Sequence, residues 1–224
     1  MKIKRIECEI DQHMYDVIFS TDRLIKSKMQ LLSILLESLR YMMYKSNSPL
    51  TRPCGKIIIY IDKMSRIFFF SDKKYYSISL AMTVIENQSK CESEPKYEFE
   101  LNGIRLTSQL ISSLIELLNS GIERVLSSID FADLIDGEER KFENEVWATF
   151  RDLILFEEGY IRYDRDINAY SEAVKRGHGD LHPENHLDIC LRSGSQFKLG
   201  LNKELSENEF IDILNIKTSC KFIS

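Results

Sequence analysis

The stretch that decides the fold runs from 159 to 201 and holds three strand-like segments separated by polar residues. The first segment reads GYIRYDRD over 159–166, the second reads HLDICLR over 186–192, and the third reads FKLGL over 197–201. Polar and apolar residues alternate in these segments because successive side chains of a strand point to opposite faces. The polar residues Ser-Gly-Ser-Gln between the second and third segments are typical of a hairpin turn. This stretch therefore predicts a three-stranded antiparallel sheet.

A second group of strands is predicted in the first half of the chain. Apolar runs at 56–61 and 66–70 are separated by four residues, a spacing that favours a hairpin, and a third run follows at 75–82. The first two runs are continuous rather than alternating, which predicts strands buried on both faces. Residues 97–101 alternate cleanly and end at an Asn-Gly pair, which is a turn signal.

Helices are predicted between these strands and at the end of the chain. Leucine and methionine recur at helical spacing over 22–44, and further helices are expected over 107–121, 122–129 and 137–158. The last helix is expected to begin at Ser206, where Ser-Glu-Asn-Glu fits a capping box. The stripe over 22–44 predicts packing in a core, since such stripes usually face one.

The predicted architecture is an α+β fold, with an antiparallel sheet in two sequence blocks and helices packed on it. A length of 224 residues and a hydrophobic fraction of 43% suffice for a sizeable core. We expect a single domain over 1–224. The alternative is a subdivision into 1–96, with the first helix and the meander, and 97–224, with the remaining helices and the C-terminal sheet.

Composition excludes some classes of function. The formal net charge is -5 and the pI is about 5.5, which argues against binding of nucleic acid through bulk positive charge. The five cysteines are far apart and show no C-x-x-C pair, which argues against a disulfide framework or a zinc ribbon. No targeting segment is apparent, and the longest apolar run is too charged to cross a bilayer. We therefore predict a cytoplasmic protein that does not engage a membrane.

Most residues that could carry chemistry fall on the polar face of the predicted C-terminal sheet. They are Arg162, Asp164, His186, Asp188, Arg192 and Lys198. If the apolar face packs on helices, these side chains form one open surface. His182 stands four residues before His186, and Pro183 restricts the chain between them.

The histidines and carboxylates fit two kinds of site. His182 and His186 could act as general acid and base near neutral pH, with Asp164 and Asp188 as their carboxylate partners. Imidazole and carboxylate groups also ligate divalent metals, and His182, His186 and Asp188 would then be the ligands. Because Pro183 disfavours a helix, the spacing of the two histidines does not place them on one helical face. A structural role for His186, which would tie a loop to a strand, stays open.

The cations on the same face suit phosphate groups. Arg162, Arg192 and Lys198 could each contact phosphate. Acid–base groups beside phosphate contacts would suit cleavage or transfer on a nucleic acid or nucleotide. The alternative is a sheet with one wet face, whose polar side chains only remain solvated.

The C-terminal block resembles an uncharacterised prokaryotic family with an Arg-aromatic-Asp strand, a His-Pro-x-x-His-Leu motif, two strands and a closing helix with a phenylalanine. Here these elements correspond to 162–164, 182–187, 197–201 and 210–214. The block is also similar to TumE-type toxins, which follow an Arg-Tyr-Asp strand with a histidine-rich segment. Where the family often has an Arg-x-Pro strand, this chain has Phe-Lys-Leu at 197–199. The resemblance implies a toxin or antiphage-defence setting and a protein partner encoded nearby.

Two functional hypotheses follow. In the first, the chain belongs to a bacterial conflict system, and its C-terminal His/Asp/Arg site acts on or binds nucleic acid or nucleotide. In the second, the chain is a non-enzymatic subunit of a larger complex. The histidine block is then structural, and the function lies in an apolar surface such as the helix over 22–44.

Overall fold

The computed structural model confirms the predicted α+β class. It describes residues 4–19, 25, 27–45, 49–87, 95–120, 144–190 and 197–221. Within these ranges the strands form a seven-stranded and a three-stranded sheet, and all pairings are antiparallel. The larger sheet takes its strands from two sequence blocks, as predicted.

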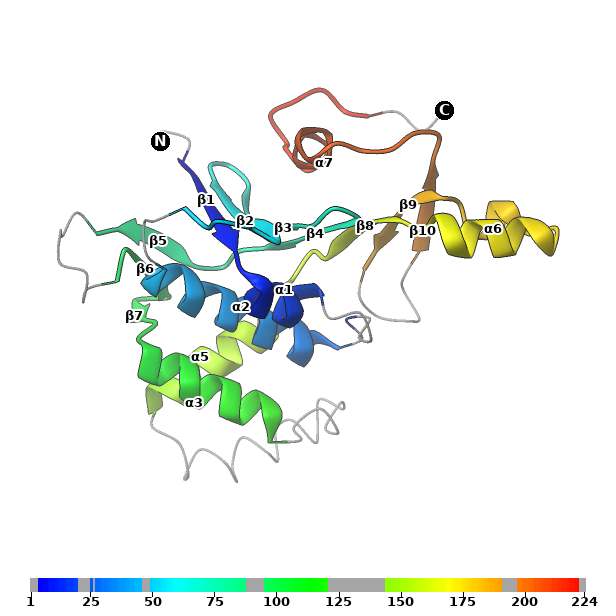
Figure 1. Cartoon of the computed structure of the whole chain (residues 1–224). Coiled ribbons are helices and arrows are strands. Elements are labelled where there is room, and N and C mark those ends of the chain that lie inside the picture. The colour runs from blue at the N-terminus through cyan, green and yellow to red at the C-terminus, as the bar shows by residue number, and fades with distance from the viewer. Residues whose placement is uncertain are drawn as a thin grey trace. The chain divides into compact units, whose positions relative to one another are not determined.

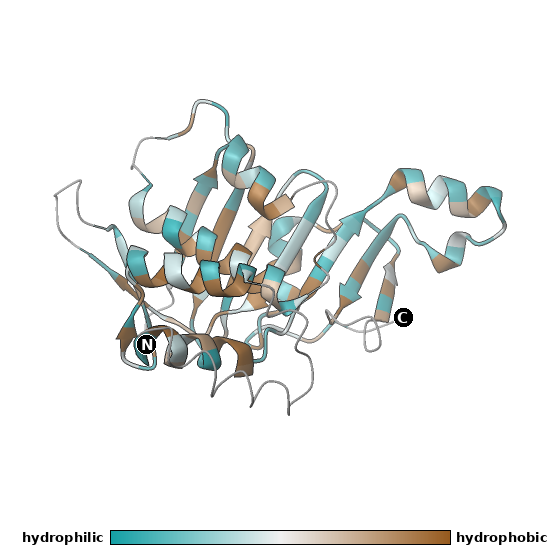
Figure 2. Cartoon of the chain, turned by 90° about the horizontal axis from the view of Figure 1, so that it is seen from below, coloured by the Kyte–Doolittle hydropathy of each residue, from teal (hydrophilic) through white to brown (hydrophobic). Residues whose placement is uncertain are grey.

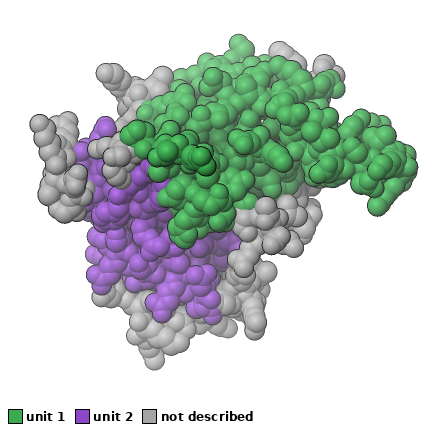
Figure 3. Space-filling view, in the orientation of Figure 1, with its two compact units in different colours: residues 1–23, 49–80, 158–224 green, residues 24–48, 81–157 purple. Residues whose placement is uncertain are grey.

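The chain divides into two compact units, each assembled from separate segments (Figure 3). Unit 1 comprises 1–23, 49–80 and 158–224, and unit 2 comprises 24–48 and 81–157. These segments do not coincide with a division at residue 96, because the chain leaves unit 1 twice and returns to it. The two units are described separately below.

Unit 1 contains the larger sheet, with strand order β1-β2-β3-β4-β8-β9-β10. The strands are β1 Lys4–Ile10, β2 Gly55–Ile61, β3 Ser65–Phe70, β4 Lys74–Ser79, β8 Ile161–Arg165, β9 Asn185–Ile189 and β10 Phe197–Leu201. The hairpin β2–β3 and the strand pair β9–β10 match the predicted segments. Since β4 pairs with β8, residues more than eighty positions apart in the chain become neighbours in the centre of the sheet.

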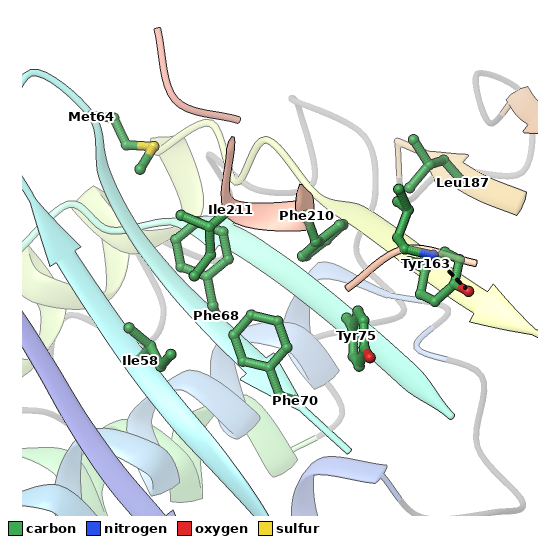
Figure 4. Close-up of a cluster of buried hydrophobic side chains, with 10 residues drawn as sticks. Ile58, Met64, Phe68, Phe70, Tyr75, Tyr163, Leu187, Phe210 and Ile211 are labelled. Carbon is green, nitrogen blue, oxygen red and sulfur yellow. Dashed lines mark hydrogen bonds between the residues drawn. The ribbon is translucent and has the colours of Figure 1, made fainter. Parts of the chain in front are cut away.

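Both faces of this sheet are covered within unit 1. On one face, α7 (Glu207–Ile213) places Phe210 against Phe68 and Phe70, at 6.2 Å between ring centroids in each pair (Figure 4). The predicted capping box at the start of α7 is present. On the other face, α1 (Gln12–Phe19) packs Phe19 edge-on against Tyr76, with ring centroids 5.7 Å apart. The continuous apolar runs of β2 and β3 are accordingly buried on both sides.

Unit 2 contains the smaller sheet and three helices in the described part of the chain. Its elements are α2 Lys28–Tyr44, β5 Thr83–Glu86, β6 Tyr97–Leu101, β7 Ile104–Arg105, α3 Ser108–Asn119 and α5 Asn144–Leu155. The leucine and methionine stripe of α2 is buried, which confirms its predicted core role. At the Asn102-Gly103 turn both residues have positive φ, as the turn signal predicts.

Some elements differ from the prediction. Residues expected as a polar loop form the helix α6 (Ile167–Lys175), followed by a short 3-10 helix, η2, at Gly179–Leu181. The helix α1 was also not predicted. The described part of α2 begins at Lys28 with Ser27 as its cap, whereas the predicted start at 21–22 and the predicted helix at 122–129 lie outside the described residues.

The helix α6 extends away from the β9–β10 end of the sheet (Figures 1 and 2). None of its residues is buried, and apolar residues (brown in Figure 2) occur along its length. Sequence periodicity missed α6 because its nine residues are fewer than the window of about 11 or more over which helical spacing can be recognised.

Among the described helices, none combines the length and the apolar character needed to cross a bilayer.

The contact between α7 and the sheet yields a first prediction. Phe210→Ala removes a fully buried ring that touches three aromatic side chains, so it should lower the free energy of unfolding by about 3–5 kcal/mol. Phe197→Ala is the matched control, because the Phe197 ring is exposed and its loss should change stability by about 0.5 kcal/mol or less. Urea denaturation followed by circular dichroism measures both, and equal losses would contradict this packing.

Candidate functional site

The start of β8 is fixed by a glycine and a partly buried arginine. Gly159 has a φ of 50°, and a Cβ there would lie 2.8 Å from the Ser79 hydroxyl oxygen. Its carbonyl accepts a hydrogen bond from the Arg66 guanidinium, which also donates to the side chains of Ser77 and Ser79. A larger residue at 159 would be strained. These contacts set the register in which β8 enters the sheet.

That register brings two rows of side chains together on one face. In the first row Arg162 lies opposite Asp188, and Asp188 lies opposite Lys198. In the second row Asp164 lies opposite His186. Directly opposed residues share a face in an antiparallel pair. The predicted grouping of these five residues on one face is therefore confirmed.

The centre of this face is buried, which corrects the expectation of one open surface, and only its rim at Lys198 is exposed. The exposed fraction is 8% for Arg162, 2% for His186 and 1% for Asp188. Desolvated charges are costly unless they are paired. The side chains on neighbouring strands supply those partners. The alternation along a single strand does not show which strands are neighbours, so it could not predict this pairing.

Arg162 joins the two carboxylates. Its Nε lies 2.6 Å from Asp164 Oδ2, and its Nη2 donates a hydrogen bond to Asp188 Oδ2. Burial by itself lowers the pKa of Arg162, but Asp164, Tyr160 and Asp188 together outweigh that effect, so its pKa lies above the ordinary value. Arg162 therefore stays charged and forms ion pairs with two carboxylates. Because these ion pairs occupy its guanidinium, Arg162 orients the carboxylates and is less suited to the predicted phosphate contact.

His186 is held by the loop that precedes it. Its Nδ1 lies 3.0 Å from the carbonyl oxygen of Pro183. A carbonyl only accepts hydrogen bonds, so Nδ1 carries the hydrogen. The opposite ring atom, Nε2, faces Asp164 Oδ2 at 3.9 Å and Asp188 Oδ2 at 4.0 Å. Gly200, opposite His186 on β10, leaves room for Pro183, because a Cβ there would lie 3.0 Å from the Pro183 ring.

We call Asp164, His186 and Asp188 the carboxylate–histidine cluster. Each offers one ligand atom, and these three atoms lie within 4.8 Å of one another. His182, which the sequence suggested as a ligand, lies beside the cluster. Its ring centroid is 5.0 Å from that of His186, and its Nε2 is 3.8 Å from Asp166 Oδ2. The structure thus brings Asp164 into the group of three in place of His182.

The remaining predicted site residues fall in different places. Lys198 Nζ lies 3.9 Å from Asp188 Oδ1, at the rim of the cluster. Arg192, predicted as a phosphate contact, lies outside the described residues. Asp166 lies beyond the end of β8 and caps α6, where its Oδ1 accepts a hydrogen bond from the backbone N–H of Ala169.

Two neighbours of the cluster were not predicted. Lys74, on β4, places its Nζ 3.8 Å from Asp164 Oδ1. Tyr160 is buried next to Arg162; burial raises the pKa of its hydroxyl to about 12, although Arg162 acts in the opposite direction. This hydroxyl therefore remains a hydrogen-bond donor at neutral pH. The pairing of β4 with β8 joins distant parts of the chain, and the predicted strand began at residue 75, so no pattern in the sequence connected Lys74 with the cluster.

Chemically, the cluster offers one ring nitrogen and two carboxylates close together. Arg162 pairs with both carboxylates, and Lys74 and Lys198 each approach one of them. Such a set could bind a divalent cation or move a proton. Comparisons with models of protein families, with curated proteins and with solved structures found no match. The resemblance of the C-terminal block to a prokaryotic family therefore stays a prediction.

The pairing of Arg162 yields a second prediction. Arg162→Gln leaves two buried carboxylates without their cation, so the free energy of unfolding should fall by about 3–5 kcal/mol at neutral pH. Arg151→Gln is the matched control, since the Arg151–Asp152 pair lies at the surface and should contribute about 0–1 kcal/mol. Urea denaturation measures both changes. A loss for Arg162→Gln no larger than that of the control would contradict a structural role for this ion pair.

Proposed function

We propose that the carboxylate–histidine cluster acts on, or binds, phosphate groups of a nucleic acid or nucleotide. The observation that carries the proposal is the pair of lysines that flank the cluster. Lys74 and Lys198 each approach a carboxylate from a neighbouring strand, and their side chains are 37% and 43% exposed. A lysine held at this distance by charge alone can turn towards a phosphate oxygen, because its stem is flexible.

The balance of charge supports the same proposal. The two side-chain rows across β4, β8, β9 and β10 hold three cations and two carboxylates. The whole chain has a formal net charge of -5. An excess of positive charge that is confined to this small part of the sheet suits the binding of one phosphate group. It suits the binding of a long stretch of nucleic-acid backbone less well.

Within this proposal each group has a role. In the metal-free site His186 is the acid–base group, since its Nδ1 is fixed and its Nε2 faces the site. If a metal ion occupied Nε2, the acid–base role would pass to His182. Asp164 and Asp188 set the charge around Nε2, and Arg162 holds both carboxylates in place. His182, whose ring lies against that of His186, is a second proton carrier at the edge of the site.

The setting of this activity follows from the resemblance of the C-terminal block. A toxin or antiphage-defence component, encoded beside a protein partner and acting in the cytoplasm, is the context that we propose. Nucleic acids and nucleotides are substrates on which such a component would act.

A second function, that of an interaction subunit, is favoured by one observation. The helix α6 has no buried residue, and Ile167 and Val174, seven residues apart on one side of it, are both exposed. Leu181, in η2, is also exposed. An apolar stripe on an extended helix suits a protein partner. The α2 stripe, the earlier candidate surface, is buried and does not support this function.

The phosphate contacts yield a third prediction. Lys198→Gln should weaken binding of a fluorescently labelled single-stranded oligonucleotide or of a labelled nucleoside triphosphate. For the oligonucleotide, the slope of log K against log salt should become shallower by about 0.7, the value for one phosphate contact. Lys175→Gln on α6 is the matched control and should leave binding unchanged, because Lys175 lies away from the cluster. Fluorescence anisotropy measures both, and equal effects of the two variants would contradict the assignment.

The cluster itself yields a fourth prediction. The double variant His186→Ala/Asp188→Ala should abolish turnover of labelled RNA, DNA or nucleotide while the chain keeps its circular dichroism spectrum. Turnover is followed by gel electrophoresis or by chromatography of the nucleotides. A double variant that folds and retains turnover would contradict the proposal. Unfolding of each single variant, together with a stoichiometric protein partner that copurifies with the wild type, would favour the interaction subunit instead.

A further inference from the structure

We infer that the carboxylate–histidine cluster binds one divalent transition-metal ion, through Asp164, His186 and Asp188. The role of this ion in phosphate chemistry rests on the proposed function, whereas its binding rests on the geometry of the cluster alone.

The first argument is the orientation of the imidazole. Because Nδ1 of His186 donates to the carbonyl of Pro183, the neutral ring presents a lone pair at Nε2. That lone pair faces Oδ2 of Asp164 and Oδ2 of Asp188, at 3.9 and 4.0 Å. These distances are too long for hydrogen bonds. Arg162 supplies one positive charge for these two carboxylates. The lone pair of Nε2 therefore still faces two oxygens that carry net negative charge, and a cation bound between the three atoms would offset it.

The second argument is an unpaired oxygen. Oδ1 of Asp188 is buried and has no hydrogen-bond partner within the described part of the chain. The Lys198 ammonium lies 3.9 Å from it, beyond hydrogen-bond distance. Buried polar atoms are nearly always satisfied, so an unpaired carboxylate oxygen at such a site points to a missing ligand. A metal ion that Asp188 holds through both of its carboxylate oxygens would satisfy Oδ1 as well.

The third argument is the support behind the three ligand atoms. Metal-binding histidines almost always donate their other ring N–H to a carbonyl or carboxylate, and ligating carboxylates are themselves hydrogen-bonded. His186 has the carbonyl of Pro183, Asp188 accepts a hydrogen bond from Arg162, and Asp164 forms an ion pair with the same guanidinium. Each Oδ2 has one side towards Arg162 and another towards His186, so Arg162 can stay in place when the metal binds.

The ligand set indicates the class of metal. Two carboxylates and one imidazole suit Mn²⁺ or Zn²⁺, whereas Mg²⁺ prefers oxygen ligands alone and keeps more of its water. Three protein ligands leave coordination positions free for water or a phosphate oxygen, as in catalytic rather than structural metal sites. The exposed side chains of Lys74 and Lys198 at the rim are placed to meet the remaining charge of such a phosphate.

The test is a metal titration of the full chain after treatment with EDTA and removal of the chelator. Isothermal titration with MnCl₂ and with ZnCl₂, and the electron paramagnetic resonance signal of free Mn²⁺, should both report one ion per chain. Asp164→Asn and His186→Gln should each weaken binding at least about tenfold, since even changes behind the ligands cost that much. Asp164→Asn keeps the shape of the side chain and decides the matter if His186→Gln does not fold.

Two histidine variants complete the experiment. His178→Ala is the matched control, because His178 is exposed and away from the cluster, and it should bind metal as the wild type does. His182→Ala should also retain the metal, since His182 is not among the three ligands. Absence of stoichiometric binding in the wild type would overturn the inference. So would a loss of binding in His182→Ala with none in Asp164→Asn.

The outcome separates this inference from the proposed function. The metal titration contains no nucleic acid, and the same chain is assayed with labelled oligonucleotide and nucleoside triphosphate in the presence of EDTA and of MnCl₂. Turnover in EDTA without metal binding would overturn the metal site and leave the function standing. Metal binding without any binding of oligonucleotide or nucleotide would overturn the function and leave the metal site standing.

Discussion

The guanidinium of Arg162 lies between two carboxylates on neighbouring strands, and the polar face of the sheet depends on this contact. Without Arg162, Asp164 and Asp188 would place two negative charges side by side in a region from which water is excluded. Such an arrangement is unstable unless a cation compensates it. Once the carboxylates are fixed by Arg162, the imidazole of His186 has a defined electrostatic environment, and the cluster has a fixed shape.

The opposite face of the same strands holds this arrangement rigid. Tyr163, which lies between Arg162 and Asp164 in β8, points into the aromatic core beneath α7 (Figure 4). Its hydroxyl donates to the side chain of Asn185 at 2.7 Å and accepts a hydrogen bond from the backbone N–H of Leu205. Packing on the apolar face therefore fixes the spacing of β8 and β9, and that spacing sets the distances within the cluster. The strands β8 and β9 thus carry core residues on one face and the residues of the candidate site on the other.

Local patterns predicted much of this fold. The alternation in 161–165 and 185–189 assigned Arg162, Asp164, His186 and Asp188 to one face, and the capping box marked the start of α7. Other features left no such pattern. The helix α6 is only nine residues long, which is too short for its periodicity to stand out in the sequence. Lys74 reaches the cluster only through the pairing of β4 with β8, which joins distant parts of the chain.

The amino-acid sequence alone was enough to predict the α+β class, the strands of the meander, and five of the six residues that form the centre and the rim of the polar face. It did so because helix and strand periodicity is a local property of the chain. The tertiary structure decided that this face is buried, that Asp164 rather than His182 joins His186 and Asp188, and that Arg162 serves the carboxylates. These outcomes depend on which strands become neighbours. Burial and ion pairing are properties of the assembled sheet, and no single segment contains them.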